Sequence, residues 1–347
     1  MSDYSAIKGS KIQSLSSDPS DPYEGQIWYN STTGEFKEYD VYSTGVWSTG
    51  ATMGVFRSLM TQTGSQTSAI SMTGGTPSNS YDTISQSWNG SAWTTTASMN
   101  TGRSTAGSAG ASSTSAIAIG GDVGPINVTG TEYITETESW NGTAWTVVNP
   151  LAEGGYAMGC VGTQTDAISF NSRWNPPTQP PTVGYNTNTQ SWNGTSWTVI
   201  PATQSVSRSW RGAAGTSTSA LSFSDFNGNV ESYNGTAWTA AANVNNARNY
   251  AGGGGASNSD AMTFGGGNPP ASIAYYDSTE VYNGTSFSTA NPLIVATASI
   301  SQVNSGPTSA GVLGSGNSDL TSFSRTGYTQ LWNGGPIGAS VKIDGSF

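Results

Sequence analysis

Four arginines occupy equivalent places in a chain that is otherwise short of positive charge. Each stands seven residues before a recurring glycine, and they are Arg57, Arg103, Arg208 and Arg248. A second column holds an acceptor two residues before a recurring aromatic: Asp40, Gln86, Glu138, Gln190, Glu231, Glu280 and Gln330. The planar guanidinium fork matches carboxylate, amide and carbonyl oxygens. The spacing therefore predicts structural arginine bonds within or between repeats. An arginine ring that binds an anion at a channel mouth is the functional alternative.

The residues that usually carry out catalysis are few. The chain has no histidine, which removes the commonest general base and metal ligand. Cys160 lies in a run of small residues, and we interpret it as a packing residue. Glu132, Glu136 and Glu138 share a strand face, as the carboxylates of a glycosidase could, but Glu138 belongs to the acceptor column. We expect no enzymatic activity, no bound metal and no cofactor.

Three irregular insertions are better candidates for binding, because loops on a rigid scaffold commonly carry it. They run over 121–133, 174–181 and 268–276, and each leaves the second strand of a repeat. Equivalent connections project from one rim, so we predict a nearly uncharged aromatic surface made by Arg173, Trp174, Tyr185, Tyr275 and Tyr276. Such a surface suits stacking on sugar rings or packing against another protein. Ordered loops that bind nothing are the alternative.

Charge and composition exclude several classes of partner. The 347 residues include 21 acids and 11 bases, and a net charge of −10 argues against a nucleic-acid surface. No apolar run reaches the about 18 residues of a membrane span, so we expect no membrane insertion. A single cysteine leaves no internal disulfide. The 12 Trp and 15 Tyr, placed periodically, supply burial that a disordered tract lacks.

The elements that position these residues repeat along the chain. The phrase Trp140-Asn141-Gly142-Thr143-Ala144-Trp145 recurs with variations, and its first aromatic stands at 42, 88, 140, 192, 233, 282 and 332. Asn-Gly between strand-like runs predicts a two-residue type I′ hairpin. Trp88 would then lie opposite Ser91 and Gln86 opposite Trp93, so that the two tryptophans share a face as a diagonal pair.

A pair of small-residue strands, such as 106–110 and 116–121, precedes each aromatic pair. Each period of about 50 residues thus holds four strands, bulky on one face and small on the other. Radial stacking buries both faces, which predicts an all-β β-propeller of four-stranded blades. Six units run over about 53–336. Three strands within 25–50 and a C-terminal strand at 338–346 predict a seventh blade, closed by pairing of the N- and C-terminal strands. Six blades plus a separate N-terminal hairpin is the alternative. We assign residues 1–22 to an extended docking arm, with a frayed terminus as the alternative, and 23–347 to the propeller.

Two resemblances support this architecture. The double glycines Gly74-Gly75, Gly120-Gly121 and Gly265-Gly266, and Met99 followed by Arg103, are similar to kelch repeats, although the paired aromatics here are closer together than in the usual motif. The segment from Asp21 to Gly34, followed by Phe36-Lys37, resembles a short module of structural proteins of tailed bacteriophages. The whole chain resembles divergent kelch-like proteins of marine tailed phages.

The resemblance implies a non-enzymatic structural protein of a phage virion, synthesised in the host cytoplasm. It implies that the arm at 1–22 contacts other virion proteins and that the rim is presented to a partner or a host-surface glycan. A tail-fibre or spike adhesin that binds a host glycan receptor is the first alternative. A carbohydrate-processing propeller enzyme is the second.

Overall fold

The computed structural model describes residues 12–19, 26–40, 45–76, 80–124, 133–174, 184–207, 212–223, 227–267, 275–297, 312–315, 327–334 and 339–342. For 38–40, 174, 312–315 and 339–342 it describes the backbone alone. The regular elements of these ranges are all strands, and no helix within them is long and apolar enough to cross a membrane. The chain divides into two compact units: unit 1 comprises 1–44 and 335–347, and unit 2 comprises 45–334.

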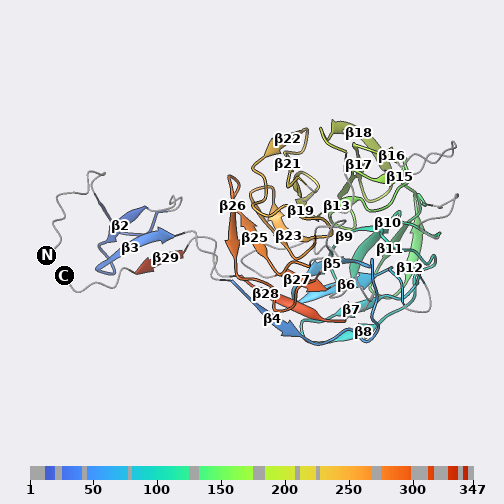
Figure 1. Cartoon of the computed structure of the whole chain (residues 1–347), viewed down its shortest axis with the longest axis horizontal. Coiled ribbons are helices and arrows are strands. Elements are labelled where there is room, and N and C mark those ends of the chain that lie inside the picture. Colours follow the sequence, from blue (N-terminus) through green and yellow to red (C-terminus); the bar gives the residue numbers. More distant parts are fainter. Residues whose placement is uncertain are drawn as a thin grey trace. The chain divides into compact units, whose positions relative to one another are not determined.

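Unit 2 is built from successive antiparallel sheets that stand around a common centre (Figure 1). Blade 1 contains β5 (Thr61–Ser65), β6 (Ser68–Met72), β7 (Gln86–Trp88) and β8 (Trp93–Thr95). Blade 2 contains β9 (Gly107–Ser112), β10 (Ser115–Ile119), β11 (Thr137–Trp140) and β12 (Trp145–Val148). Blade 3 contains β13 (Gly159–Gly162), β14 (Ala167–Phe170), β17 (Asn188–Trp192) and β18 (Trp197–Thr203). Blade 4 contains β19 (Gly212–Thr216), β20 (Ser219–Phe223), β21 (Val230–Tyr233) and β22 (Trp238–Ala241). Blade 5 contains β23 (Gly252–Ser257), β24 (Asp260–Phe264), β25 (Thr279–Tyr282) and β26 (Phe287–Ala290).

Blade 6 joins the two ends of unit 2. Its described strands are β27 (Val312–Ser315), β28 (Thr329–Asn333) and β4 (Val46–Gly50), in that order across the sheet. The β28–β4 pairing sets Trp332 opposite Trp47 and Leu331 opposite Ser48. The strand that enters unit 2 therefore completes its last blade, and the outer aromatic position of that blade is filled by Trp47.

Consecutive blades are joined by hydrogen bonds of the outer-strand tryptophans. In five blades the indole Nε1 donates to a hydroxyl of the preceding blade, at 2.8–3.1 Å. The acceptor lies on the strand next to the outer strand, or one residue before it: Trp93 to Thr329, Trp145 to Ser85, Trp197 to Thr137, Trp238 to Thr189, and Trp47 to Thr279. Blade 1 is thus bonded to blade 6, and blade 6 to blade 5. The inner strands β5, β9, β13, β19 and β23 also contact one another in turn. These contacts run in a circle, as a propeller requires.

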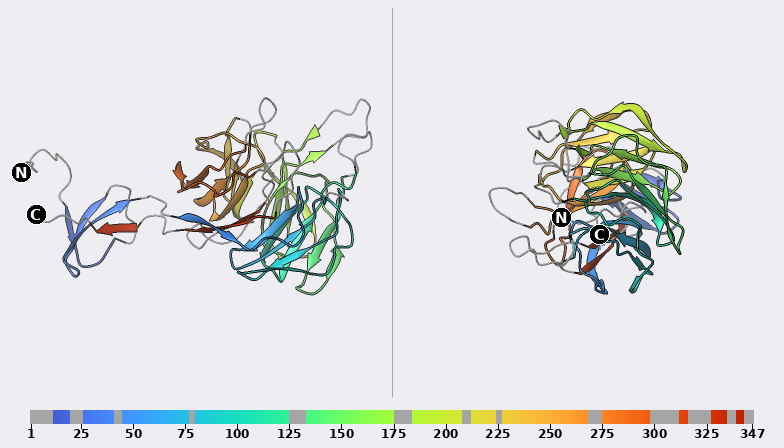
Figure 2. Two further views of the ribbon diagram at one scale, coloured as in Figure 1. Left: turned by 60° about the horizontal axis from the view of Figure 1, so that its bottom comes forward. Right: turned by 90° about the vertical axis from the view of Figure 1, so that its right-hand side faces the viewer.

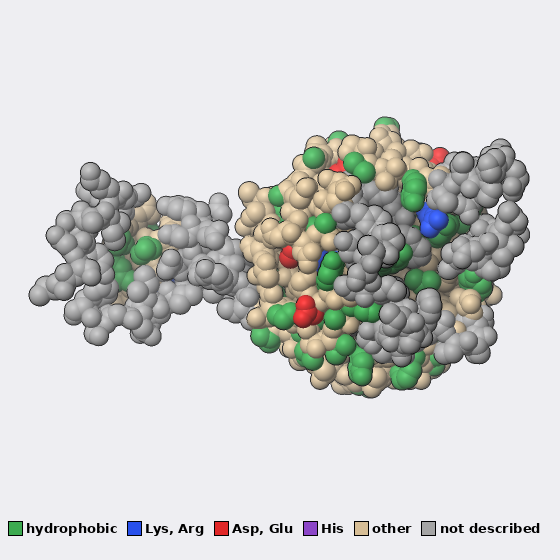
Figure 3. Space-filling model, viewed as in Figure 1, with side chains coloured by type: hydrophobic (Ala, Val, Ile, Leu, Met, Phe, Trp, Pro, Cys, Tyr) green, Lys and Arg blue, Asp and Glu red, His purple; other side chains and the backbone are tan. Residues whose placement is uncertain are grey.

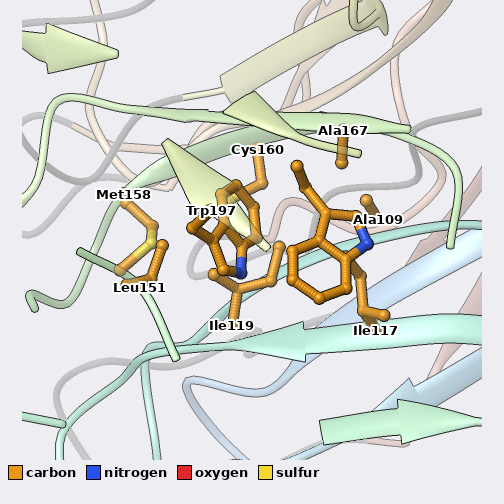
Figure 4. Close-up of a cluster of buried hydrophobic side chains, with 9 residues drawn as sticks. Ala109, Ile117, Ile119, Leu151, Met158, Cys160, Ala167 and Trp197 are labelled. Carbon is orange, nitrogen blue, oxygen red and sulfur yellow. The ribbon is translucent and has the colours of Figure 1, made fainter. Parts of the chain in front are cut away.

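Apolar packing fills the space between the blades. Between blades 2 and 3, Ile117 and Ile119 of β10 lie against Cys160 and Trp197 from blade 3 (Figure 4). Cys160 is fully buried, and burial raises the pKa of its thiol to about 12. Ala116 pairs with Trp140 and Ile117 pairs with Ser139, so each face of the sheet is bulky over one strand pair and small over the other. The prediction of one bulky and one small face per sheet is therefore wrong, because the inner and outer strand pairs place their large side chains on opposite faces.

The aromatic hairpins differ from prediction in their loops. Trp88 pairs directly with Trp93, not with Ser91, so the loop has four residues in place of two. The Asn89 side chain is the cause, because its Oδ1 accepts from the backbone N–H groups of Ser91 (3.0 Å) and Ala92 (2.9 Å). Only the glycine then takes a positive φ, +94° at Gly90. The paired rings still share a face, and their centroids lie 5.4 Å apart.

Unit 1 is a separate four-stranded sheet in the order β1 (Gln13–Leu15), β2 (Ile27–Asn30), β3 (Glu35–Asp40) and β29 (Ala339–Lys342); Figure 2 gives two further views of both units. β1 lies parallel to β2. After β1, the Asp18 carboxylate accepts from Trp28 Nε1 (3.0 Å), Asn30 Nδ2 (2.8 Å) and Lys37 Nζ (2.7 Å). These bonds, the one from Lys37 first, lower the pKa of Asp18 to about 2.

The predicted fold class, an all-β propeller closed by pairing of N- and C-terminal strands, is confirmed, and the closing strands are β4 and β28. The closing strand predicted at 338–346 is wrong, because β29 pairs with β3 in the sheet of unit 1. The blade count matches the six-blade alternative. The strands of 25–50 do not form a seventh blade, because β4 pairs with β28 while β2 and β3 pair with β1 and β29. The extended arm predicted over 1–22 is wrong for residues 12–19, because β1 and Asp18 belong to the sheet of unit 1. Residues 1–11 and 20–22 of that arm lie outside the described residues.

Candidate functional site

The arginine column lies inside the blades. Arg57, Arg103 and Arg248 are completely buried, and each Nη1 donates to two carbonyls of its own blade. The Nη2 of Arg103 also bonds Glu136 (2.6 Å) and Glu138, and that of Arg248 bonds Glu280. In blade 1 the partner of Arg57 Nη2 is Ser71, at 3.0 Å to its Oγ. These donors face the protein interior, as in the structural interpretation, whereas an anion-binding ring needs them to face a channel. Arg208 lies outside the described residues.

The acceptor column anchors the chain that enters each blade. Glu138 accepts from the backbone N–H groups of Asn100 (2.8 Å) and Thr101 (3.1 Å), and Glu280 from those of Asn245 and Asn246. The other anchoring bonds join Gln190 to Glu153, Glu231 to Ser205, and Gln330 to Val295. Gln86 differs, because neither polar atom of its buried amide makes a hydrogen bond. This column therefore fixes loops, except in blade 1.

The insertions leave the blades at the end where the inner strands begin, which we call the entry rim. There, in blades 1, 2, 3 and 5, a residue before the inner strand bridges a residue after the second strand: Ser58 and Gly75, Ser104 and Asp122, Tyr156 and Arg173, Asn249 and Gly267. The next residue holds a left-handed conformation at Leu59, Thr105, Ala157 and Tyr250, with φ between 52° and 58°. These side chains therefore cluster at one end of the ring of inner strands.

Two predicted rim residues lie together. Arg173 and Trp174 form β15 (Arg173–Trp174), which pairs with β16 (Gly184–Tyr185) so that Arg173 lies opposite Tyr185. The Arg173 guanidinium carbon stands 5.6 Å from the ring centroid of Tyr156, a cation–π distance. Tyr185 is 46% exposed. Blue side-chain atoms appear beside green ones close to β15 in the surface view (Figure 3).

The remaining predicted residues lie on the blade 5 connection or are described in part. Tyr275 bridges Gly267, and the Tyr276 backbone N–H donates to Gly266 O at 2.9 Å. Both side chains are partly buried. Only the backbone of Trp174 is described. The structure thus joins Arg173 to Tyr185, and it places Tyr275 and Tyr276 in another blade of the same rim.

Sequence reasoning missed Tyr156 and Tyr250, which interact electrostatically with Arg173 and Tyr185, and Asp122, which interacts with Tyr156. Burial raises the pKa of Tyr250, while the Arg173 charge lowers it and Tyr185 raises it. Burial also raises the pKa of Tyr156. The charge of Arg173 lowers this pKa, and the charges of Asp122 and Tyr185 raise it. Burial raises the pKa of Asp122 despite backbone hydrogen bonds from Gly124 and Val123. Among the described residues, the entry rim therefore carries the buried Asp122 carboxyl and the Arg173 guanidinium among tyrosines.

A sequence signal for this rim existed. Tyrosines stand five residues before the acceptor column at Tyr81, Tyr133, Tyr185 and Tyr275. In the structure three of them bridge the residue after the second strand: Tyr133 with Asp122, Tyr185 with Arg173, and Tyr275 with Gly267. This tyrosine column lies just before the third strand, at the rim end of these blades. Counting back from the acceptors would have found it.

The architecture defines the class of the protein as a β-propeller with a separate small sheet. A solved structure titled "Structure of YjhT", itself a propeller, is similar to this chain with a TM-score of 0.63. The match covers 85% of this chain and 97% of that one at 12% sequence identity, so it speaks for the fold alone. No protein-family model matches the chain, and no curated protein matches it either.

Proposed function

We propose that this chain is a non-enzymatic structural protein of a phage virion, a propeller appendage that mediates contact with another protein or with the host surface. The observation that carries the proposal is the entry rim, where Arg173 lies between Tyr156 and exposed Tyr185. Unit 2 contains no lysine, and Arg173 is the only cation of its described residues that reaches solvent. A weakly charged aromatic surface of this kind suits a protein or glycan partner.

The chemistry of the described side chains supports a binding role over a catalytic one. Arg103, Glu138, Arg248 and Glu280 are committed to internal bonds. A thiol pKa of about 12 leaves Cys160 protonated at neutral pH, and the side chain is fully buried. A nucleophile or general base must instead reach a substrate.

The virion assignment rests on the resemblance of residues 21–37 to a module of tailed-phage structural proteins. That module forms β2, β3 and the turn between them, within unit 1. We therefore assign the docking role to unit 1 as a whole, including residues 1–11. Other virion proteins are the expected partners, and the virion is the expected location.

A second candidate is a tail-fibre or spike adhesin that binds a host glycan. The exposed ring of Tyr185 and its cross-strand partner Arg173 favour this candidate, because a flat aromatic face beside a polar donor suits a sugar ring.

Two variants separate these candidates. Removing residues 1–11 leaves β1 and the Asp18 bonds in place, so unit 1 should stay folded. We expect this deletion to abolish binding to purified particles that lack the chain, and Tyr185→Ala to leave that binding unchanged. Loss of host-cell adsorption in Tyr185→Ala, with particle binding intact, would favour the adhesin. Turnover of a glycan by the purified chain, or binding to neither particles nor cells, would overturn the proposal.

A further inference from the structure

Blade 2 buries a group of oxygen atoms that make no hydrogen bond. They are Asp122 Oδ2, Ser104 Oγ and Thr105 Oγ1, on residues that are 1%, 1% and 7% exposed. The second carboxylate oxygen of Asp122 is bonded, since Oδ1 accepts from the backbone N–H of Gly124 at 3.0 Å. Buried polar atoms in native proteins are nearly always paired, so unpaired oxygens on two bridged segments, 104–105 and 122, need an explanation.

The strand pairing brings two of these oxygens to one side of the blade. Ser104 and Asp122 exchange both backbone hydrogen bonds, N–H to O at 2.8 and 2.9 Å. Residues paired in this way stand directly opposite, with side chains on the same face and Cα atoms about 5.5 Å apart. Ser104 Oγ and Asp122 Oδ2 can therefore flank one small atom between them.

No described side chain compensates the charge of Asp122 by an ion pair. The corresponding positions of blades 1, 3 and 5 hold Gly75, Arg173 and Gly267, so blade 2 is the one of these four blades that carries a carboxylate there. An unpaired carboxylate buried away from water is costly, and a bound cation removes that cost.

We propose that Asp122 and Ser104 bind a hard metal cation at the entry rim of blade 2, with Ca²⁺ as the best fit. Carboxylate and hydroxyl oxygens suit Ca²⁺, and neither a thiolate nor an imidazole is at hand to favour a softer metal. With one carboxylate the site should be weak, with a dissociation constant on the order of 1 mM. The inference stands apart from the virion proposal, because it concerns the fold of unit 2.

The test is thermal unfolding of the full chain in EDTA and in increasing CaCl2, compared with Asp122→Asn. For the natural chain we expect the melting temperature to rise with Ca²⁺ and to saturate in the millimolar range. Asp122→Asn should be at least as stable in EDTA, because it removes the unpaired charge, and it should not respond to Ca²⁺. The two stabilities should therefore cross or converge as Ca²⁺ is added.

Two further variants keep the test decisive. Asp277→Asn, an exposed carboxylate of blade 5, is the matched control and should keep the full response. Ser104→Ala should weaken Ca²⁺ binding about tenfold in calorimetric titration, and it serves if Asp122→Asn does not fold. The proposal would be overturned if Ca²⁺ at tenfold the expected dissociation constant did not change the melting temperature of the natural chain. An equal response to Ca²⁺ in Asp122→Asn or Ser104→Ala would overturn it as well.

Discussion

Two neighbouring interfaces of the ring solve one packing problem in different ways. Between blades 3 and 4, Trp238 Nε1 donates to Thr189 Oγ1 at 2.9 Å. Between blades 4 and 5 the equivalent residues are Phe287 and Val230, which lack both the donor and the acceptor and are buried in one apolar cluster. Replacing both partners of a buried hydrogen bond by apolar groups is nearly neutral for stability, whereas replacing one partner leaves the other buried and unpaired. The comparison teaches that donor and acceptor change together along this ring.

Truncation of the outer aromatic breaks either interface and should have the largest effect. We expect Trp238→Ala and Phe287→Ala each to lower the free energy of unfolding by about 3–5 kcal/mol, because both create a large cavity. Trp238→Ala should cost about 1 kcal/mol more, since it also leaves the Thr189 hydroxyl unpaired. Urea denaturation of both variants measures the difference. Equal losses would show that the indole bond adds nothing to packing.

A double substitution converts one interface into the other. Trp238→Phe alone should lower the free energy of unfolding by about 2 kcal/mol, because it keeps most of the aromatic side chain but leaves the Thr189 hydroxyl without its partner. Adding Thr189→Val should recover about 1 kcal/mol, since the pair then copies Phe287 and Val230. The coupling energy from a double-mutant cycle reports the bond directly. Additive losses would contradict the proposed pairing.

The same contrast of paired and unpaired groups exists inside the blades. Arg103 of blade 2 has Glu138 as its partner. In blade 1 the equivalent positions hold buried Arg57 and Gln86, whose amide makes no hydrogen bond, and burial lowers the pKa of Arg57 to about 10. Gln86→Glu supplies the missing carboxylate, so we expect a gain of about 1 kcal/mol in urea denaturation. Gln330→Glu is the control and should destabilise, because the amide donates to Val295 O at 3.1 Å. A loss in both variants would contradict the account.

Unit 1 provides the smallest effect. Its Trp28 indole bonds the charged Asp18, so this tryptophan bond should depend on pH, unlike those of the ring. The folded pKa of about 2 lies below the ordinary 3.8, so the stabilisation is present above pH 3.8 and is lost as the pH falls toward 2. The Asp18 side chain is 41% exposed, so the loss should stay below about 1 kcal/mol. Trp28 fluorescence in urea at pH 5 and pH 2.5 measures it, and Asp18→Asn should show no such change.

The sequence predicts the parts of this fold that depend on local pattern. The spacing of Trp140 and Trp145 and the small strands before them were enough for a propeller of four-stranded blades. The loop length was wrong, because the Asn89 side chain takes two backbone N–H groups that the predicted turn leaves free.

Features that depend on distant pairing could not be found in the same way. Whether β4 joins β3 or β28 is decided by which edge it meets, and both pairings suit its alternating pattern. The candidate site shows the same limit. Arg173 and Tyr185 flank one insertion, so the sequence alone could place them together. Tyr250 comes from another blade, and the closure of the ring brings it within electrostatic range of both.

The central claim is a closed ring of six blades in which β4 completes the last blade. The most direct measurement is disulfide formation in Ser48→Cys/Leu331→Cys, since these positions are cross-strand partners and paired Cα atoms lie within disulfide range. We predict rapid cross-linking in the native chain on a non-reducing gel, and none in Ser48→Cys/Thr146→Cys, which joins different blades. Failure of the 48–331 pair to cross-link, while both thiols react with a maleimide, would contradict the account.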